Sequence, residues 1–153
     1  MNQIIASMSA SLGGAASIEE MIGKIKTYKL GDDQGPLNNI ESAARESVGN
    51  EESRKAIAAA LVALLSSDAT REAKVFASRQ LVICGGPEVA AGVAPLLLSI
   101  DTSSFTRYAI EQIPGGEIDA VLIGALNKAD AASQVGIVNS LGARKAASAA
   151  PAL

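Results

Sequence analysis

Residues 105–116 read FTRYAIEQIPGG, and this stretch decides the expected class of fold. It begins with apolar or small side chains at the spacing of a single helix face and ends in a Pro-Gly-Gly turn. A helix that ends in such a turn, followed at once by a second apolar pattern, predicts two helices packed side by side. The residues of the first stripe are Thr106, Ala109, Ile110 and Ile113.

The same pattern recurs on both sides of this stretch. Cys84, Ile113 and Leu141 each lie just before a turn that contains Gly, at intervals of 29 and 28 residues. Val48 holds the corresponding place 36 residues before Cys84, which indicates a longer connection in that unit. Repetition at this period is typical of solenoids, in which each helical hairpin buries its apolar face against its neighbours.

The composition agrees with this pattern. Hydrophobic residues make up 48% of the 153 residues, but aromatic residues only 3%, and there is no Trp. Small aliphatic side chains suit closely packed helices better than a β-sandwich. We therefore expect an all-α fold, an α-solenoid or superhelix built from about four αα-hairpin repeats.

The chain divides into a short leading segment and one repeat domain. Residues 1–17 are small and weakly apolar and lack the basic start of a secretory signal, so we expect a flexible or capping segment there. Ser17 and Glu20 have the spacing of a capping box, which starts the first strong helix. The repeat domain is expected over 18–153, with hairpins at about 18–48 plus 51–66, 68–98, 103–128 and 131–153.

Periodicity also predicts which side chains face the core. An apolar stripe is expected along 37–48, ending at Val48. Five further positions should be buried, and truncating any of them to Ala should leave a cavity. They are Leu61, Val93, Ile110, Leu122 and Val138.

Several short motifs resemble the HEAT-like repeats of bacterial proteins related to the phycobilisome-lyase repeat. First-helix matches are RQLVICG at 79–85, TRYAIEQIPG at 106–115 and VNSLGAR at 138–144, and second-helix matches are APLL at 94–97 and APAL at 150–153. The turn YKLGD at 28–32 is similar to one in repeat blocks of larger bacterial exported proteins, beside separate enzymatic or haem-binding modules. The resemblance thus implies a repeat fold and a fragment of a longer protein. The sequence leaves the compartment open: the protein is cytoplasmic, or periplasmic or exported if it is part of a longer protein.

The sequence lacks the residues that most kinds of catalytic site require. There is no His, which removes Ser-His-Asp and Cys-His systems and most catalytic zinc sites, and no P-loop motif is present. The net charge is −3 and the basic residues are scattered, so nucleic acid is not an expected partner. No apolar run is long enough to predict a membrane span. We expect no catalytic residue, no cofactor and no metal site.

Cys84 and the paired acids allow a functional and a structural interpretation. Cys84 could be a nucleophile or a bilin attachment point, but it holds the core-facing place of Ile113 and Leu141, which favours an inert buried thiol. The acid pairs at 19–20, 32–33 and 51–52 could serve acid–base or calcium chemistry. Each pair lies at a helix start or a turn, where the helix dipole and solvent account for it.

The expected function is a non-enzymatic protein–protein interaction scaffold or spacer, with a protein or peptide bound on a concave helix face. One alternative is an accessory repeat region of a larger exported enzyme or haem-binding protein, and another is a chromophore-lyase-like enzyme. An exposed Arg107–Tyr108 pair could anchor a partner or form a solvated face. The candidate partner-binding residues are Arg54, Glu88, Arg107, Tyr108, Glu117, Asp119, Lys128 and Lys145.

The last residues suggest an unfinished repeat. Ala150 to Leu153 resemble part of a second helix without a Gly stop signal or a basic last turn. A terminal solenoid repeat needs a polar outer face, which this unit lacks. We expect the natural protein to continue past Leu153 or another molecule to cover this end. In isolation the chain should be a monomer or associate weakly through its C-terminal repeat.

Overall fold

The computed structural model describes residues 17–153, and within that range every regular element is a helix. The prediction of an all-α fold is therefore confirmed. The leading segment predicted at 1–17 lies outside the described residues, except for Ser17.

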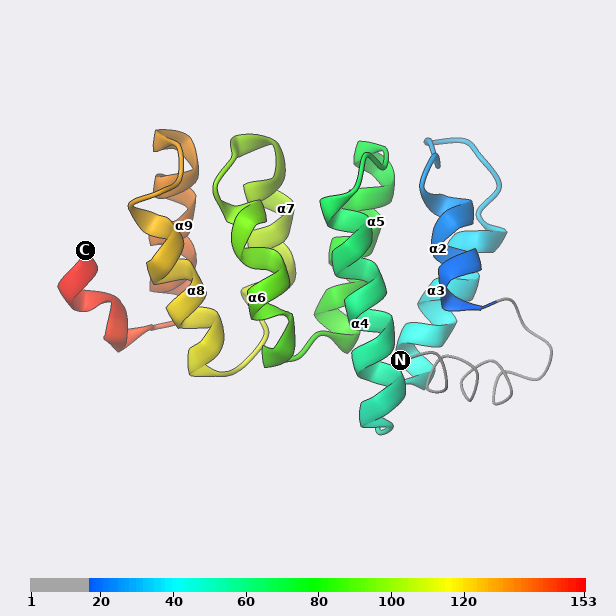
Figure 1. Ribbon diagram of the computed structural model, residues 1–153, viewed down its shortest axis with the longest axis horizontal. Helices are drawn as coiled ribbons and strands as arrows, with labels where there is room; N and C mark the ends of the chain where they lie inside the picture. Colours follow the sequence, from blue (N-terminus) through cyan, green and yellow to red (C-terminus); the bar gives the residue numbers. More distant parts are fainter. Residues whose placement is uncertain (1–16) are drawn as a thin grey trace.

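The helices stand in pairs, side by side along the long axis of the molecule (Figure 1). The first pair is α2 (Ile18–Ile25) with α3 (Gly35–Glu46), and the second is α4 (Glu51–Ser66) with α5 (Arg71–Cys84). In the third pair, α7 (Ile100–Ile110) packs on a broken first member that consists of η1 (Pro87–Val89), α6 (Ala90–Val93) and η2 (Ala94–Leu97). The fourth pair is α8 (Gly116–Leu126) with α9 (Ala131–Ala143), and η3 (Ala147–Ala152) follows it.

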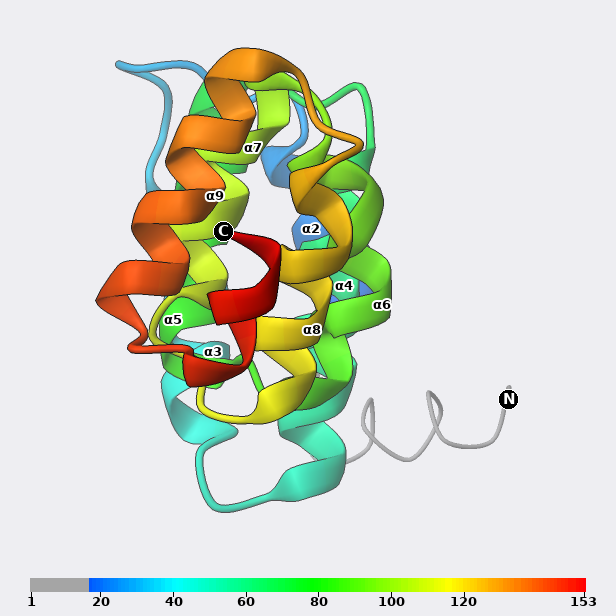
Figure 2. The same cartoon turned by 90° about the vertical axis from the view of Figure 1, so that its left-hand side faces the viewer.

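Two rows result from this pairing, as the end view shows (Figure 2). Helices α2, α4, α6 and α8 form one row, and α3, α5, α7 and α9 form the other. Within the second row α5 packs on α3 and on α7, and α7 packs on α9. The apolar core lies between the rows.

The hairpins differ in phase from the predicted ones. The predicted hairpins 68–98 and 103–128 each join the second helix of one pair to the first element of the next, and 131–153 joins α9 to η3. The partners within a pair are instead connected by the short loops before Thr70, Ser99 and Asp130. Gly85 and Gly86 are both extended, and the loop that they form leads from α5 into the third pair, where the chain runs back in the opposite direction (Figure 1).

Side-chain caps set the starts of most helices. Ser17 accepts a hydrogen bond from the backbone N–H of Glu20, whose carboxylate accepts from the N–H of Ser17, so the predicted capping box is present. Asn50, Thr70 and Asp130 cap α4, α5 and α9 in the same manner with one side-chain oxygen. These caps are local, and the sequence alone indicates them.

Four of the five predicted core residues have no exposed surface: Leu61, Val93, Ile110 and Leu122. The prediction for the fifth, Val138, is wrong, because this residue is 39% exposed. Helix α9 carries two apolar stripes one residue apart, and α7 packs against the side on which Gly136 and Ser140 allow a close approach. That contact turns Ile137 inward and Val138 outward.

Val48 is likewise not part of the core, since it is 60% exposed. Helix α3 ends at Glu46, and Ser47 takes the last buried place instead. The Ser47 hydroxyl donates to the Ala44 carbonyl at 2.7 Å, which satisfies the buried polar group. Apolar periodicity therefore continued past the real end of the helix.

The end of α9 yields a stability prediction. Lys145 has φ +53°, and the N–H groups of Lys145 and Ala146 bond back to the carbonyls of Gly142 and Leu141. This is the Schellman arrangement, in which Gly is favoured at the left-handed position. Lys145→Gly should therefore raise the free energy of unfolding by about 0.5–1 kcal/mol in a urea titration, whereas an unchanged or lower value would contradict it.

None of the helices in residues 17–153 combines the length and apolarity that crossing a lipid bilayer requires.

Candidate binding surface

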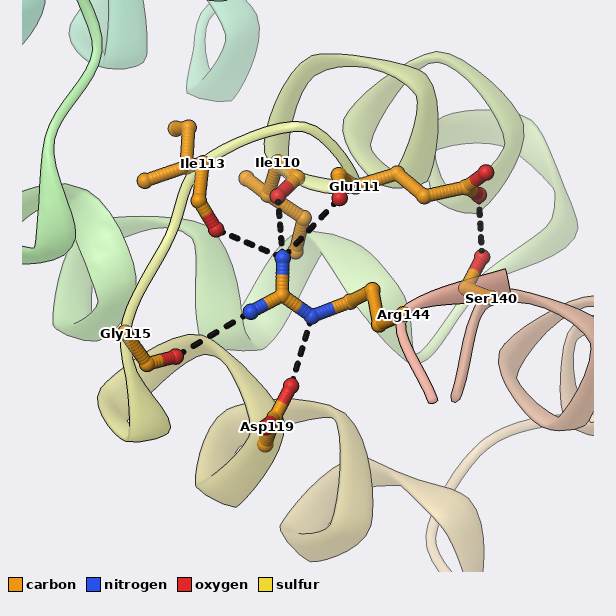
Figure 3. A network of polar contacts seen from close by, with 7 residues as sticks. All are labelled: Ile110, Glu111, Ile113, Gly115, Asp119, Ser140 and Arg144. Carbon is orange, nitrogen blue, oxygen red and sulfur yellow. Dashed lines mark hydrogen bonds and ion pairs between the residues drawn. The ribbon is translucent and has the colours of Figure 1, made fainter. Parts of the chain in front are cut away.

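The most heavily bonded polar side chain among the described residues is Arg144 (Figure 3). It follows α9, and only 8% of its side chain is exposed. Its Nε donates to the Asp119 carboxylate of α8 at 2.6 Å. Its terminal nitrogens donate to four backbone carbonyls at the end of α7 and in the following loop, those of Ile110, Glu111, Ile113 and Gly115.

The Arg144 side chain thus caps the C-terminus of a different helix. The last carbonyls of α7 have no partner within their own helix and carry partial negative charge, so a guanidinium is a suitable donor. Gly115, at φ +117°, brings its carbonyl into reach. Beside this cluster the Ser140 hydroxyl donates to the Glu111 carboxylate at 2.9 Å (Figure 3). The cluster holds α7, α8 and α9 together and leaves Asp119 little freedom to bind a partner.

Arg54 forms a similar cap one layer earlier. Its Nη1 donates to the Cys84 carbonyl at the end of α5, at 3.0 Å, and to the Glu88 carboxylate at 2.6 Å. The hydrogen bond with Glu88 raises the pKa of Arg54. Burial alone would raise the pKa of Glu88, but the hydrogen bond from Arg54 and the backbone bonds outweigh it and lower that pKa. The fold thus brings Arg54 and Glu88 together, and the two side chains form an ion pair with each other.

Arg107, which was expected to form an exposed pair with Tyr108, is only partly exposed because it packs against α9. Its Nη1 donates to the Gly136 carbonyl at 3.1 Å and approaches the Ser140 hydroxyl at 3.4 Å, both on α9. A Cβ at position 136 would collide with the guanidinium, so the glycine makes room for the arginine. Arg107 therefore stiffens the α7–α9 contact while its edge remains accessible.

Tyr108, by contrast, is 56% exposed on the outer side of α7. It borders an open depression of about 470 Å³ that is lined by residues of α5, of α7 and of the turn after α7. Val82 of α5, which is 37% exposed, supplies the other apolar part of the rim. The remaining lining is polar and comes from Ser104, Arg107, Glu111 and Gln112.

The other predicted residues are not gathered with Tyr108. Glu117 and Lys128 are exposed near opposite ends of α8, in the first row of helices, and Lys145 is exposed after α9. The structure thus divides the predicted set between two rows of helices. Glu111, Gln112 and Val82 of the depression were not predicted, because only the packing of α5 beside α7 places residues 82 and 108 on one surface.

Cys84 is buried, as expected. It has no exposed surface, and burial raises the pKa of its thiol from an ordinary 9.0 to about 11. Its Sγ lies 3.4 Å from the Gln80 carbonyl. Such a thiol is almost wholly protonated at neutral pH and is shielded from reagents, which supports a packing role.

We therefore expect slow thiol labelling in the folded protein. At pH 8 a thiol with a pKa of about 11 has a thiolate fraction about 100-fold lower than one with a pKa of 9.0, so a disulfide reagent should react at least that much more slowly than in urea. Because folding raises the pKa of the Cys84 thiol, the free energy of unfolding should fall as the pH rises from about 9 to about 11. Over this range the thiol ionises in the unfolded chain but stays protonated in the folded one. Labelling as fast as in urea would contradict the burial of Cys84.

Within residues 17–153 no group of three or more His, Cys, Asp or Glu side chains is placed to hold a metal ion. Comparisons of the chain with protein-family models, with curated proteins and with solved structures give no match.

Proposed function

We propose that this protein is a HEAT-like α-solenoid that acts as a non-enzymatic binding module, and that it binds a protein or peptide at the depression around Tyr108. The observation that carries the proposal is an exposed aromatic ring beside an exposed valine in a depression with a polar rim. Tyr and Arg are enriched among the residues that dominate the energy of protein interfaces.

The rigidity of the surroundings supports this choice. Arg107 is held by two helices, and the Glu111 carboxylate accepts from Ser140, so the polar rim is ordered before a partner arrives. Binding to a preorganised surface loses less conformational entropy. The openness and mixed polarity of the depression suit a peptide or protein surface better than a small apolar ligand, which needs an enclosed pocket.

Arg54 and Asp119 are less suitable contact residues, because each already has a charged partner within the chain. Removing either would disturb the fold as well as any binding. The proposal therefore rests on Tyr108, with Val82 and Gln112 as neighbours, and leaves Glu117, Lys128 and Lys145 outside the contact surface.

Site-specific photo-crosslinking tests the proposal. A benzophenone amino acid at Tyr108, introduced in the cells from which the protein comes, should give a cross-link to a defined protein that mass spectrometry identifies. Ile100 is the matched control, since it lies on the same helix and is also 56% exposed. The purified partner should then bind the Tyr108→Ala variant at least about tenfold more weakly, and the Ile100→Ala variant as tightly as the unmodified protein. Equal labelling from both positions, or equal affinities, would refute the proposed surface.

A further inference from the structure

Arg107 is the exception among the arginines that bridge neighbouring helices. Arg54 pairs with the Glu88 carboxylate at 2.6 Å. Arg144 pairs with the Asp119 carboxylate at the same distance. Arg107 also joins two helices, α7 and α9, but it forms no ion pair with any residue that the structure describes. Within that part of the chain its positive charge therefore has no acidic partner.

Neutral groups hold the Arg107 guanidinium in place. Its Nη1 donates to the Gly136 carbonyl at 3.1 Å. Longer contacts of 3.4 Å join Nη1 to the Ser140 hydroxyl and Nε to the Ser103 hydroxyl. An arginine has more N–H donors than these contacts use, and Nη2 has no hydrogen bond to the described residues. Because Arg107 also lines the depression around Tyr108, a molecule bound there meets a guanidinium with unused donors.

A neighbouring carboxylate limits the charge of the group that suits this position. Glu111 lies one helical turn beyond Arg107 and lines the same depression. The Ser140 hydroxyl contacts both charges, since it donates to Glu111 at 2.9 Å and lies 3.4 Å from Nη1 of Arg107. A single carboxylate from a ligand gains charge-assisted hydrogen bonds from Arg107. A phosphate carries more negative charge, so Glu111 would repel it more strongly.

The rest of the depression favours a peptide over a small carboxylic acid. Tyr108 and Val82 present exposed apolar surface, and Ser104 and Gln112 supply neutral hydrogen-bonding groups. One peptide segment covers these groups together, with an apolar side chain on Tyr108 and Val82 and an acidic side chain at Arg107. A small acid would leave the apolar part of the rim in water. Because the two contacts line one depression, the acidic and apolar residues of the peptide lie close together in its sequence.

We propose that the depression around Tyr108 selects a peptide segment that carries an aspartate or glutamate beside an apolar residue, and that Arg107 determines this specificity. The inference rests on the binding function proposed above and adds the chemistry of the partner. The acid of the peptide gives Arg107 the kind of ion pair that Arg54 and Arg144 form within the chain.

Selection from a random-peptide library displayed on phage tests the proposal. The unmodified chain should select peptides with Asp or Glu at a fixed place beside an apolar residue. These peptides should bind the Tyr108→Ala variant at least about tenfold more weakly. Replacing the selected acid by its amide in a synthetic peptide should weaken binding to the unmodified chain about tenfold, the effect of a hydrogen bond to a charged group.

Two variants assign the acid preference to Arg107. Arg107→Gln should bind the acid and amide peptides equally, because the charge that distinguishes them is gone. Arg71→Gln is the matched control, since it makes the same charge change at the exposed start of α5, outside the depression, and should keep the tenfold difference. Urea unfolding checks that Arg107→Gln is folded, and the comparison of the two peptides on the unmodified chain does not depend on any variant.

The outcomes separate this inference from the binding function on which it rests. Selected peptides that depend on Tyr108 but show no acid preference, or that prefer Lys or Arg, would overturn the role of Arg107 and leave the binding surface in place. An acid preference that persists in Arg107→Gln would do the same. If no peptide is selected, or if Tyr108→Ala binds the selected peptides unchanged, the proposed surface itself fails.

Discussion

Replacing Arg144 by Met should lower the free energy of unfolding by about 3–5 kcal/mol, the cost of removing one partner of a buried ion pair. The substitution keeps most of the apolar stem but leaves the Asp119 carboxylate without its guanidinium, and only 21% of that side chain is exposed. It also removes the donor to four carbonyls at the end of α7 and in the loop that follows. Urea unfolding followed by circular dichroism measures the loss.

Arg45→Met is the matched control for this prediction. The Arg45 side chain is 64% exposed, and its one side-chain partner within residues 17–153 is Glu41, one turn away on the same helix. Exposed pairs of this kind contribute little, so the control should change the free energy of unfolding by at most about 0.5 kcal/mol. If both substitutions cost the same, the cap formed by Arg144 has no special role in stability.

Ile137→Ala should lower the free energy of unfolding by about 2–5 kcal/mol, whereas Val138→Ala on the next residue should change it by at most about 0.5 kcal/mol. Ile137 has no exposed surface, so its truncation leaves a cavity between the rows, while Val138 is 39% exposed. Urea titrations of the two variants under identical conditions measure the difference. A larger loss at Val138 would restore the register expected from the sequence.

The division between these two neighbours illustrates how far periodicity could predict the core. Leu61, Val93, Ile110 and Leu122 each lie on a single apolar stripe, and each is buried. In α9 the spacing of valines competes with that of Ile137 and Leu141. Only the close approach of α7 to Gly136 resolves the choice, and that contact comes from another part of the chain.

The candidate site was predicted less well than the core. Tyr108 is exposed as expected, but Arg107 turns toward α9, and Arg54 and Asp119 have partners 34 and 25 residues away along the chain. The sequence does not distinguish a charged side chain that is solvated from one that caps a distant helix. Its partner depends on which loops the packing brings within reach.

The sequence by itself determined the all-α class, the capping box at Ser17, the turn at Gly49 and the burial of Cys84. These features depend on residues within one or two helical turns or on a pattern repeated along the chain, so local physics suffices. The tertiary structure alone decided the phase of the pairs, the inward face of α9, the cap formed by Arg144 and the depression beside Tyr108. Each of these requires two segments separated by about one repeat to meet, and the free energy of that contact depends on side-chain fit rather than on local sequence.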